Sequence, residues 1–112
     1  MILFELSIII PVLNEEENIA TLIDLLHERS YGISAEIIVV DGGSSDRTME
    51  ISLSKNATVI SSAKGRPMQM NKGAERASGK ILWFLHADSI PPVHYDKFIL
   101  EAVQSGYLSG CF

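Results

Sequence analysis

The sequence predicts an α/β fold in which a doubly wound, mostly parallel sheet forms one domain, residues 1–112. Three observations favour this class. Short runs of β-branched and other apolar residues alternate with helical periodicity, the connections are only a few residues long, and glycine or proline marks most ends. Strands that alternate with helices over short loops imply right-handed crossovers, so the strands lie parallel and helices cover both faces. A chain of 112 residues has room for one such domain.

The first strand is expected at residues 6–12, which are rich in β-branched side chains. Pro11 indicates its end, because proline has no N–H for a sheet ladder. Asn14 is expected to cap the helix that follows, while Glu17, three residues later, reaches back to the cap. Apolar residues at helical spacing give this helix its buried face: Ile19, Leu22, Ile23 and Leu26.

The second unit repeats this pattern. Residues 36–40 form another β-branched run, and the glycine turn at 41–46 leads through a serine cap into a helix near 46–54. A third, short run of strand character covers residues 57–61. The order so far is strand, helix, strand, helix, strand.

The third helix is expected to begin at Pro67, which suits a first helical position, and to end at Gly79. Gly73 lies inside it and costs stability relative to alanine, so we expect a close backbone approach there. The apolar run at residues 81–85 then predicts a strand buried on both faces, as in the middle of a parallel sheet.

A last helix is expected at residues 95–105. Residues 107–112 resemble a new strand that has only begun, so we expect a sheet that is truncated at its C-terminal side. A free sheet edge invites pairing, and we therefore expect this edge to associate with a second copy of the chain.

Composition limits the possible partners. A net charge of −5 argues against nucleic acid, and five of the nine lysines and arginines lie in one segment, 64–80, which suits a small anionic ligand. Cys111 is the single cysteine, which excludes an intramolecular disulfide and indicates a reducing compartment. Residues 1–13 lack the features of a signal peptide and are too short to span a bilayer. We expect a cytoplasmic protein, with the inner face of the membrane as a further possible location.

Three polar segments, 11–16, 41–46 and 86–88, each follow a predicted strand. In open α/β sheets the carboxyl ends of the strands meet at one edge, where ligands bind. Glu15 there either favours the helix dipole or accepts from ribose hydroxyls. Asp41 either forms a turn or accepts from a nucleobase N–H.

Charged residues near this edge suit a diphosphate and a metal. Lys64 and Arg66 precede a helix N-terminus, where they either bind an anion or belong to a solvated loop. Asp88 is a hard ligand for Mg²⁺ or Mn²⁺, and His86 either fits Mn²⁺ or acts through hydrogen bonds only. The alternative for this pair is a capped strand end with a satisfied histidine.

Four segments in this order form a recognisable pattern: Pro-Val-Leu-Asn-Glu-Glu at 11–16, Val-Val-Asp-Gly-Gly-Ser-Ser-Asp-Arg-Thr at 39–48, Asn-Lys-Gly at 71–73 with Ala-Ser-Gly at 77–79, and Phe-Leu-His-Ala-Asp at 84–88. Together they resemble the family 2 glycosyltransferases, whose GT-A fold is Rossmann-like. The resemblance is strongest to the bacterial branch whose metal motif is His-Ala-Asp.

The resemblance implies a UDP- or GDP-sugar donor, a divalent cation, Mn²⁺ or Mg²⁺, and transfer with inversion to an acceptor of unknown identity. It implies that Pro11, Leu13 and Glu15 contact the nucleoside, Asp41 the base, and Asp88 the metal and diphosphate. His86 stands where the family's Asp-x-Asp motif has its first carboxylate. The nucleotide-sugar site expected from the residues and the resemblance comprises Pro11, Leu13, Glu15, Asp41, Gly43, Lys64, Arg66, His86, Ala87 and Asp88, with Asp88 and His86 at the metal.

In this family the general base lies well downstream of the metal motif, so it is expected beyond Phe112 and no catalytic residue is expected within the chain. The chain then corresponds to the donor domain, the N-terminal half of a longer glycosyltransferase. Without the base, the alternative is a non-catalytic module that binds nucleotide sugar or only assembles. A nucleotidyltransferase would have a glycine-rich loop after the first strand, and residues 11–14 do not supply one.

Overall fold

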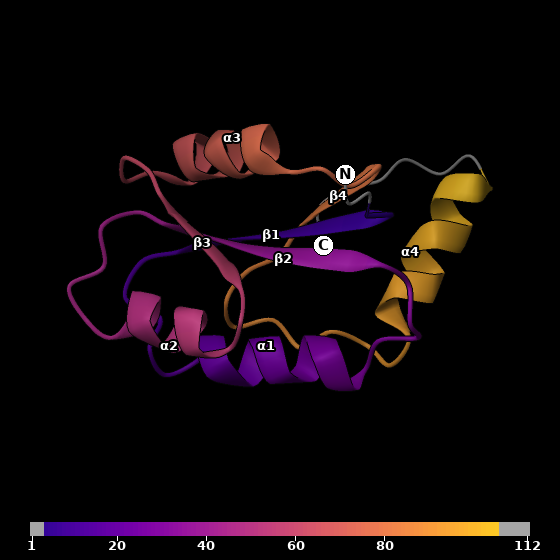
Figure 1. Ribbon diagram of the computed structural model, residues 1–112, viewed down its shortest axis with the longest axis horizontal. Helices are drawn as coiled ribbons and strands as arrows, with labels where there is room; N and C mark the ends of the chain where they lie inside the picture. Colours follow the sequence, from indigo (N-terminus) through magenta and orange to yellow (C-terminus); the bar gives the residue numbers. More distant parts are fainter. Residues whose placement is uncertain (1–3, 106–112) are drawn as a thin grey trace.

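The computed structural model describes residues 4–105 and has an α/β architecture around a four-stranded, all-parallel sheet in the order β3-β2-β1-β4 (Figure 1). This confirms the fold class that the sequence predicts. The elements, in chain order, are β1 (Leu6–Val12), α1 (Ile19–Glu28), β2 (Ala35–Asp41), α2 (Thr48–Ser54), β3 (Thr58–Ser61), α3 (Arg66–Arg76), β4 (Ile81–Phe84) and α4 (Tyr95–Gln104).

Pro11 lies inside β1 and does not end it, contrary to the expectation. Residues of a parallel strand bond alternately to the two neighbouring strands. Ile9 O accepts from Leu85 N (2.9 Å) on the β4 side, whereas Val12 O accepts from Gly42 N (3.0 Å) on the β2 side. Pro11 therefore directs its missing donor toward β4 at a point where that strand has already ended. The proline costs no ladder bond at this position.

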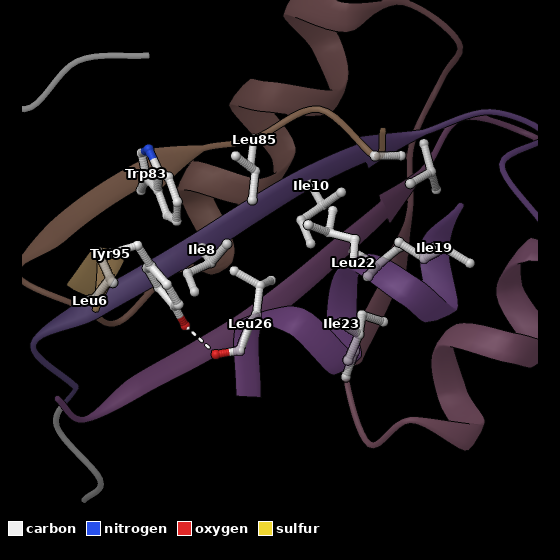
Figure 2. Close-up of a cluster of buried hydrophobic side chains, with 14 of the residues drawn as sticks. Leu6, Ile8, Ile10, Ile19, Leu22, Ile23, Leu26, Trp83, Leu85 and Tyr95 are labelled. Atoms are coloured by element: carbon white, nitrogen blue, oxygen red, sulfur yellow. Dashed lines mark hydrogen bonds between the residues drawn. The ribbon is translucent and has the colours of Figure 1, made fainter. Parts of the chain in front are cut away.

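Helices cover both faces of the sheet. Figure 1 shows α1 and α2 on one face and α3 on the other, while α4 stands at the end where the strands begin. The larger core lies between the sheet and α1 (Figure 2), and Tyr95 joins it by stacking on Trp83 at 5.2 Å between ring centroids. The Tyr95 hydroxyl donates to Leu26 O (2.8 Å), which fixes α4 against the end of α1.

Gly73 brings α3 close to the sheet, as the sequence predicts. A Cβ on Gly73 would lie 3.0 Å from Cγ2 of Val40 and closer still to Cγ2 of Ile9. These contacts are too short for a real side chain, so only glycine allows α3 to pack directly on β1 and β2. The close packing places the first turn of α3 near the carboxyl ends of these two strands.

The start of α1 differs from the expectation. Asn14 does not cap this helix, which begins at Ile19 after Asn18 and has no side-chain cap. Asn14 has a φ of +54° and directs its side chain to the loop after β2. An asparagine tolerates this left-handed conformation better than most residues. The polar residues after β1 therefore serve the loops and not the helix.

The remaining boundaries shift by a few residues. The serine cap expected for α2 is absent, since this helix begins at Thr48 after Arg47 without a side-chain cap. In β4, Leu82 and Phe84 are only partly buried, so one face of this strand is less covered than expected. The strand and pairing edge expected at residues 107–112 lie outside the described residues. Between residues 4 and 105 no helix has the length and apolar character needed to cross a membrane.

Candidate functional site

The loops after β1 and β2 are fastened to each other at the carboxyl edge of the sheet. Six hydrogen bonds join residues 14–16 to residues 44–48: Asn14 N to Ser44 Oγ (2.9 Å), Ser45 N to Asn14 Oδ1 (2.8 Å), Ser45 Oγ to Asn14 Oδ1 (3.4 Å), Glu15 N to Thr48 Oγ1 (2.8 Å), Glu16 N to Asp46 Oδ2 (3.3 Å) and Arg47 N to Glu16 Oε2 (3.1 Å). Residues 14–16 and 44–48 therefore form one connected unit, which we call the rim. The bonded residues are about thirty positions apart in the chain.

Asp46 organises this rim as a carboxylate. Its Oδ1 accepts from Thr48 N (2.9 Å) and from the Thr48 hydroxyl. Partial burial would raise the pKa of Asp46, but the hydrogen bonds from Thr48 and Glu16 outweigh burial and lower the pKa below its ordinary value. The negative charge of Asp46 is thus used within the loops.

Asp41, the last residue of β2, has one carboxylate oxygen in use and one without a partner. Its Oδ2 accepts from Gly43 N (2.9 Å) and Ser44 N (2.8 Å), in a turn that the φ of +108° at Gly43 permits. Its Oδ1 has no hydrogen-bond partner among residues 4–105. Water cannot supply one easily, because the residue is only 2% exposed. An unpaired buried carboxylate oxygen is costly. This atom therefore keeps unused acceptor capacity at this edge of the sheet.

A hollow of about 260 Å³ opens between the loop after β1 and the start of α3. Glu15 borders it while its Oε1 accepts from Asn18 Nδ2 (3.0 Å). The hollow has an apolar wall and two cations, and it brings together five of the expected site residues. Its lining consists of Pro11, Val12, Leu13, Glu15, Lys64, Gly65, Arg66 and Gln69.

His86 and Asp88 follow β4 and are both exposed. Leu85, before His86, and Ala87, between the two, are buried. The alternation of a strand does not fix the directions of these two side chains, because the chain turns here and Ser89 N donates to His86 O (3.1 Å). Nη1 of Arg66 lies 3.3 Å from Nε2 of His86, and because a guanidinium only donates, the imidazole nitrogen accepts. The contact connects the hollow with the segment after β4.

Asp88 borders a second hollow, of about 230 Å³, together with Ala87 and the first half of α1. The expected site residues therefore occupy one edge of the sheet but not one cavity. Asp41 lies at the tip of β2, five expected residues line the first hollow, His86 joins them through Arg66, and Asp88 faces the second hollow.

Asp88 fits a divalent cation only when other ligands complete the site. Among the residues from 4 to 105, no group of three or more His, Cys, Asp or Glu side chains could hold a metal. Nε2 of His86 is already engaged by Arg66. Mg²⁺ and Mn²⁺ often bind through one or two carboxylates, with phosphate oxygens and waters as the remaining ligands. The exposed carboxylate of Asp88 suits this arrangement.

Gln69 is the residue of this edge that the sequence analysis missed. It is 5% exposed, and its amide bonds to the ends of both central strands. One signal could have identified it: Gln69 lies one helical turn before Gly73, so it shares the face of α3 that the glycine places against the sheet. A polar side chain on that face must find buried partners.

Comparisons with known proteins identify relatives of this chain in sequence and in fold. The dolichol-phosphate mannosyltransferase of Pyrococcus furiosus is 32% identical over 108 residues, which cover 91% of this chain and 31% of that protein. The glucosyl-3-phosphoglycerate synthase of Mycobacterium tuberculosis is 32% identical over 96 residues, which cover 78% of this chain and 30% of that protein. The chain thus spans about a third of the length of these curated relatives.

The crystal structure of the M. tuberculosis synthase with Mn²⁺, UDP-glucose and phosphoglyceric acid has a TM-score of 0.78 and 26% sequence identity to this chain, and the match covers 92% of this chain and 40% of that one. The family model of glycosyl transferase family 2 matches residues 7–110. This match covers nearly the whole chain and includes the strands, the rim and the segment after β4. The chain therefore belongs to glycosyl transferase family 2.

Proposed function

We propose that this chain binds the UDP-sugar donor of a metal-dependent, inverting glycosyltransferase. The observation that carries the proposal is the buried, unpartnered Oδ1 of Asp41 at the tip of β2. A nucleobase N–H would supply the hydrogen bond that the described residues do not. The synthase of M. tuberculosis, which shares the family and the fold, binds UDP and UDP-glucose, and this supports the same nucleotide here.

The geometry of Asp41 favours uracil over guanine. Uracil presents one imide N–H on its pairing edge, whereas guanine presents two neighbouring N–H groups that suit both oxygens of a carboxylate. Oδ2 of Asp41 already accepts from Gly43 N and Ser44 N, so one oxygen remains. One free acceptor matches one N–H donor. Guanine would leave a donor without a partner, which costs about 1–3 kcal/mol when it is buried.

The diphosphate would lie beside Lys64 and Arg66, whose side chains border the hollow next to Pro11, Leu13 and Glu15. Asp88 would hold the divalent cation, and a bound cation would offset the negative charge that the diphosphate acquires when it leaves the sugar. We propose that the acceptor surface and the general base lie outside residues 1–112. In this proposal the chain is the donor-binding part of a longer transferase, about a third of its length.

Nucleotide binding tests the proposal. Titration calorimetry with UDP, in the presence of Mn²⁺, should show binding to the chain and weaker binding of GDP. Asp41→Asn keeps one oxygen for the turn at Gly43 and replaces the free acceptor with a donor. The variant should lose about 10- to 100-fold in affinity for UDP, since a hydrogen bond to a charged group contributes about 1.5–3 kcal/mol. Equal affinity of Asp41→Asn and the unsubstituted chain for UDP would refute the base contact.

Asp24→Asn is the matched control, because Asp24 is an exposed aspartate of α1 that pairs with Lys55 and lines neither hollow. It removes the same charge and should leave the affinity for UDP unchanged. Donor hydrolysis, measured on the same chain with UDP-glucose, separates an enzyme from a binding module. Turnover would show that the chain itself catalyses cleavage of the donor, while binding without turnover supports a donor-binding part.

A further inference from the structure

Gln69 connects the two central strands through one amide group. Its Nε2 donates to Val12 O and to Val40 O, both at 2.9 Å. Val12 is the last residue of β1, and Val40 precedes Asp41 at the end of β2. Both hydrogens of the amide are used, and the side chain is almost fully buried. Gln69 therefore holds α3 to the tips of the two strands from which the rim begins.

The oxygen of the same amide reaches the first turn of α3. Oε1 accepts from Gly65 N (3.3 Å), and Gly65 adopts a φ of +133° that few other residues could adopt. Lys64 and Arg66 flank this glycine and border the hollow next to the rim. One side chain thus sets the position of two cations relative to the ends of β1 and β2.

Gly42 makes room for this amide. A Cβ on Gly42 would lie 2.8 Å from both Cδ and Oε1 of Gln69, a distance that real side chains do not show. Gly42 also follows Asp41 directly and donates to Val12 O (3.0 Å). Gly42, next to Asp41, therefore lies directly against the Gln69 amide, which bonds the backbone between Lys64 and Arg66.

We propose that Gln69 is a positioning residue that fixes the spacing between Asp41 and the pair Lys64 and Arg66, so that one nucleotide meets both ends of the site. The proposal rests on the proposed function, in which Asp41 binds the base and the two cations bind the diphosphate. A uridine ligand needs only the Asp41 end. UDP needs both ends at the correct separation, so the ratio of the affinities for UDP and uridine reports the spacing.

A double-mutant cycle on the full chain tests this inference. Gln69→Ala removes the amide, whereas Gly42→Ala keeps every hydrogen-bonding group and displaces the amide through steric contact. Each change should lower the UDP-to-uridine affinity ratio about tenfold. In the Gln69→Ala background the added methyl group meets no amide, so Gly42→Ala should lower the ratio no further. Such non-additivity identifies the contact between the two residues as the cause.

A role in stability alone would lower the melting temperature and leave this ratio unchanged. A ratio within about twofold of the unsubstituted value in both single variants overturns the inference, even when UDP binds well. If Gln69→Ala does not fold, because Val12 O and Val40 O each lose the hydrogen bond from the amide, the result for Gly42→Ala decides alone. Gln104→Ala, at an exposed position of α4, is the control and should leave the ratio unchanged.

Failure of the proposed function gives a different result. If the unsubstituted chain binds neither UDP nor uridine, the donor site itself is refuted, and the role of Gln69 is refuted with it. If the chain binds uridine as tightly as UDP, Asp41 retains its role, and the inference about Gln69 is overturned because the cations contribute nothing to spacing.

Discussion

The buried carboxylates at the two ends of the sheet differ in how many of their oxygens have hydrogen-bond partners. At the end where the strands begin, Asp96 is 1% exposed and all its acceptor capacity is used. At the end where they finish, Asp41 is 2% exposed and keeps a buried oxygen without a partner among the described residues. The partners of Asp96 are Ser30 Oγ and the backbone N–H groups of Tyr31, Gly32, Ile33 and Lys97, at 2.7–3.3 Å.

This difference separates structure from function. A buried carboxylate with a full set of donors stabilises the folded chain, because each donor would otherwise lose its hydrogen bond to water. A buried carboxylate with a free oxygen does not optimise stability, and under the proposed function a ligand N–H supplies the missing hydrogen bond. Substitutions at the two ends should therefore differ in kind. The first should affect the free energy of unfolding, and the second should affect binding.

The largest loss of stability is expected for Asp96→Ala. The change leaves the N–H groups of the loop before β2 without acceptors and should lower the free energy of unfolding by about 3 kcal/mol. Urea unfolding measures this loss. The affinity for UDP should not change in the folded fraction, since the ends of a seven-residue strand are about 20 Å apart. Weakened UDP binding in folded Asp96→Ala would contradict the separation of roles.

The stability of the folded chain should depend on pH through Asp96, at the same end of the sheet. Burial would raise the pKa of Asp96, but the hydrogen bonds from Ser30, Tyr31, Ile33 and Lys97 outweigh burial and lower it. A lowered folded pKa means that the folded state binds fewer protons. The stability from Asp96 is therefore present above its unfolded pKa of about 4 and is lost as the pH falls through the folded pKa.

Urea midpoints measured from about pH 7 down to pH 2.5 should fall most steeply below about pH 4. The slope should be shallower in Asp96→Ala, because this variant has no carboxyl group at position 96 to protonate. An identical slope in the variant and the unsubstituted chain would show that Asp96 does not contribute to acid unfolding.

A smaller loss is expected at Glu36, which also lies where the strands begin. Glu36 Oε2 accepts from Ser7 Oγ (2.6 Å), Ser78 N (2.6 Å) and Ser78 Oγ (2.9 Å), but the residue is only partly buried. Glu36→Gln should lower the free energy of unfolding by about 1 kcal/mol, as measured in urea. Glu50→Gln is the control. Its exposed pair with Arg47 should contribute less than about 0.5 kcal/mol.

The sequence predicted what depends on local patterns. Alternating strands and helices specified the parallel sheet, and this topology places the polar residues at the ends of the strands, such as Asp41 and Asp88, along one edge. The predictions failed where distant residues meet. Asn14 resembled a helix cap because local spacing could not show that its acceptor serves Ser45, 31 positions away. Gln69 was missed for the same reason, since its partner Val12 lies 57 positions away.

The smallest loss of stability is expected at Asp88, which is exposed and, within residues 4–105, has no hydrogen bond or ion pair. Asp88→Ala should change the free energy of unfolding by less than about 0.5 kcal/mol without nucleotide. The same change should abolish the Mn²⁺-dependent part of the rise in melting temperature that UDP produces, because a ligand raises stability only through the contacts it makes in the folded state. Asp24→Ala, at an exposed site on α1, should keep the full Mn²⁺-dependent rise. An equal Mn²⁺-dependent rise in Asp88→Ala would place the cation elsewhere and remove Asp88 from the donor site, while the contrast between Asp96 and Asp41 would stand.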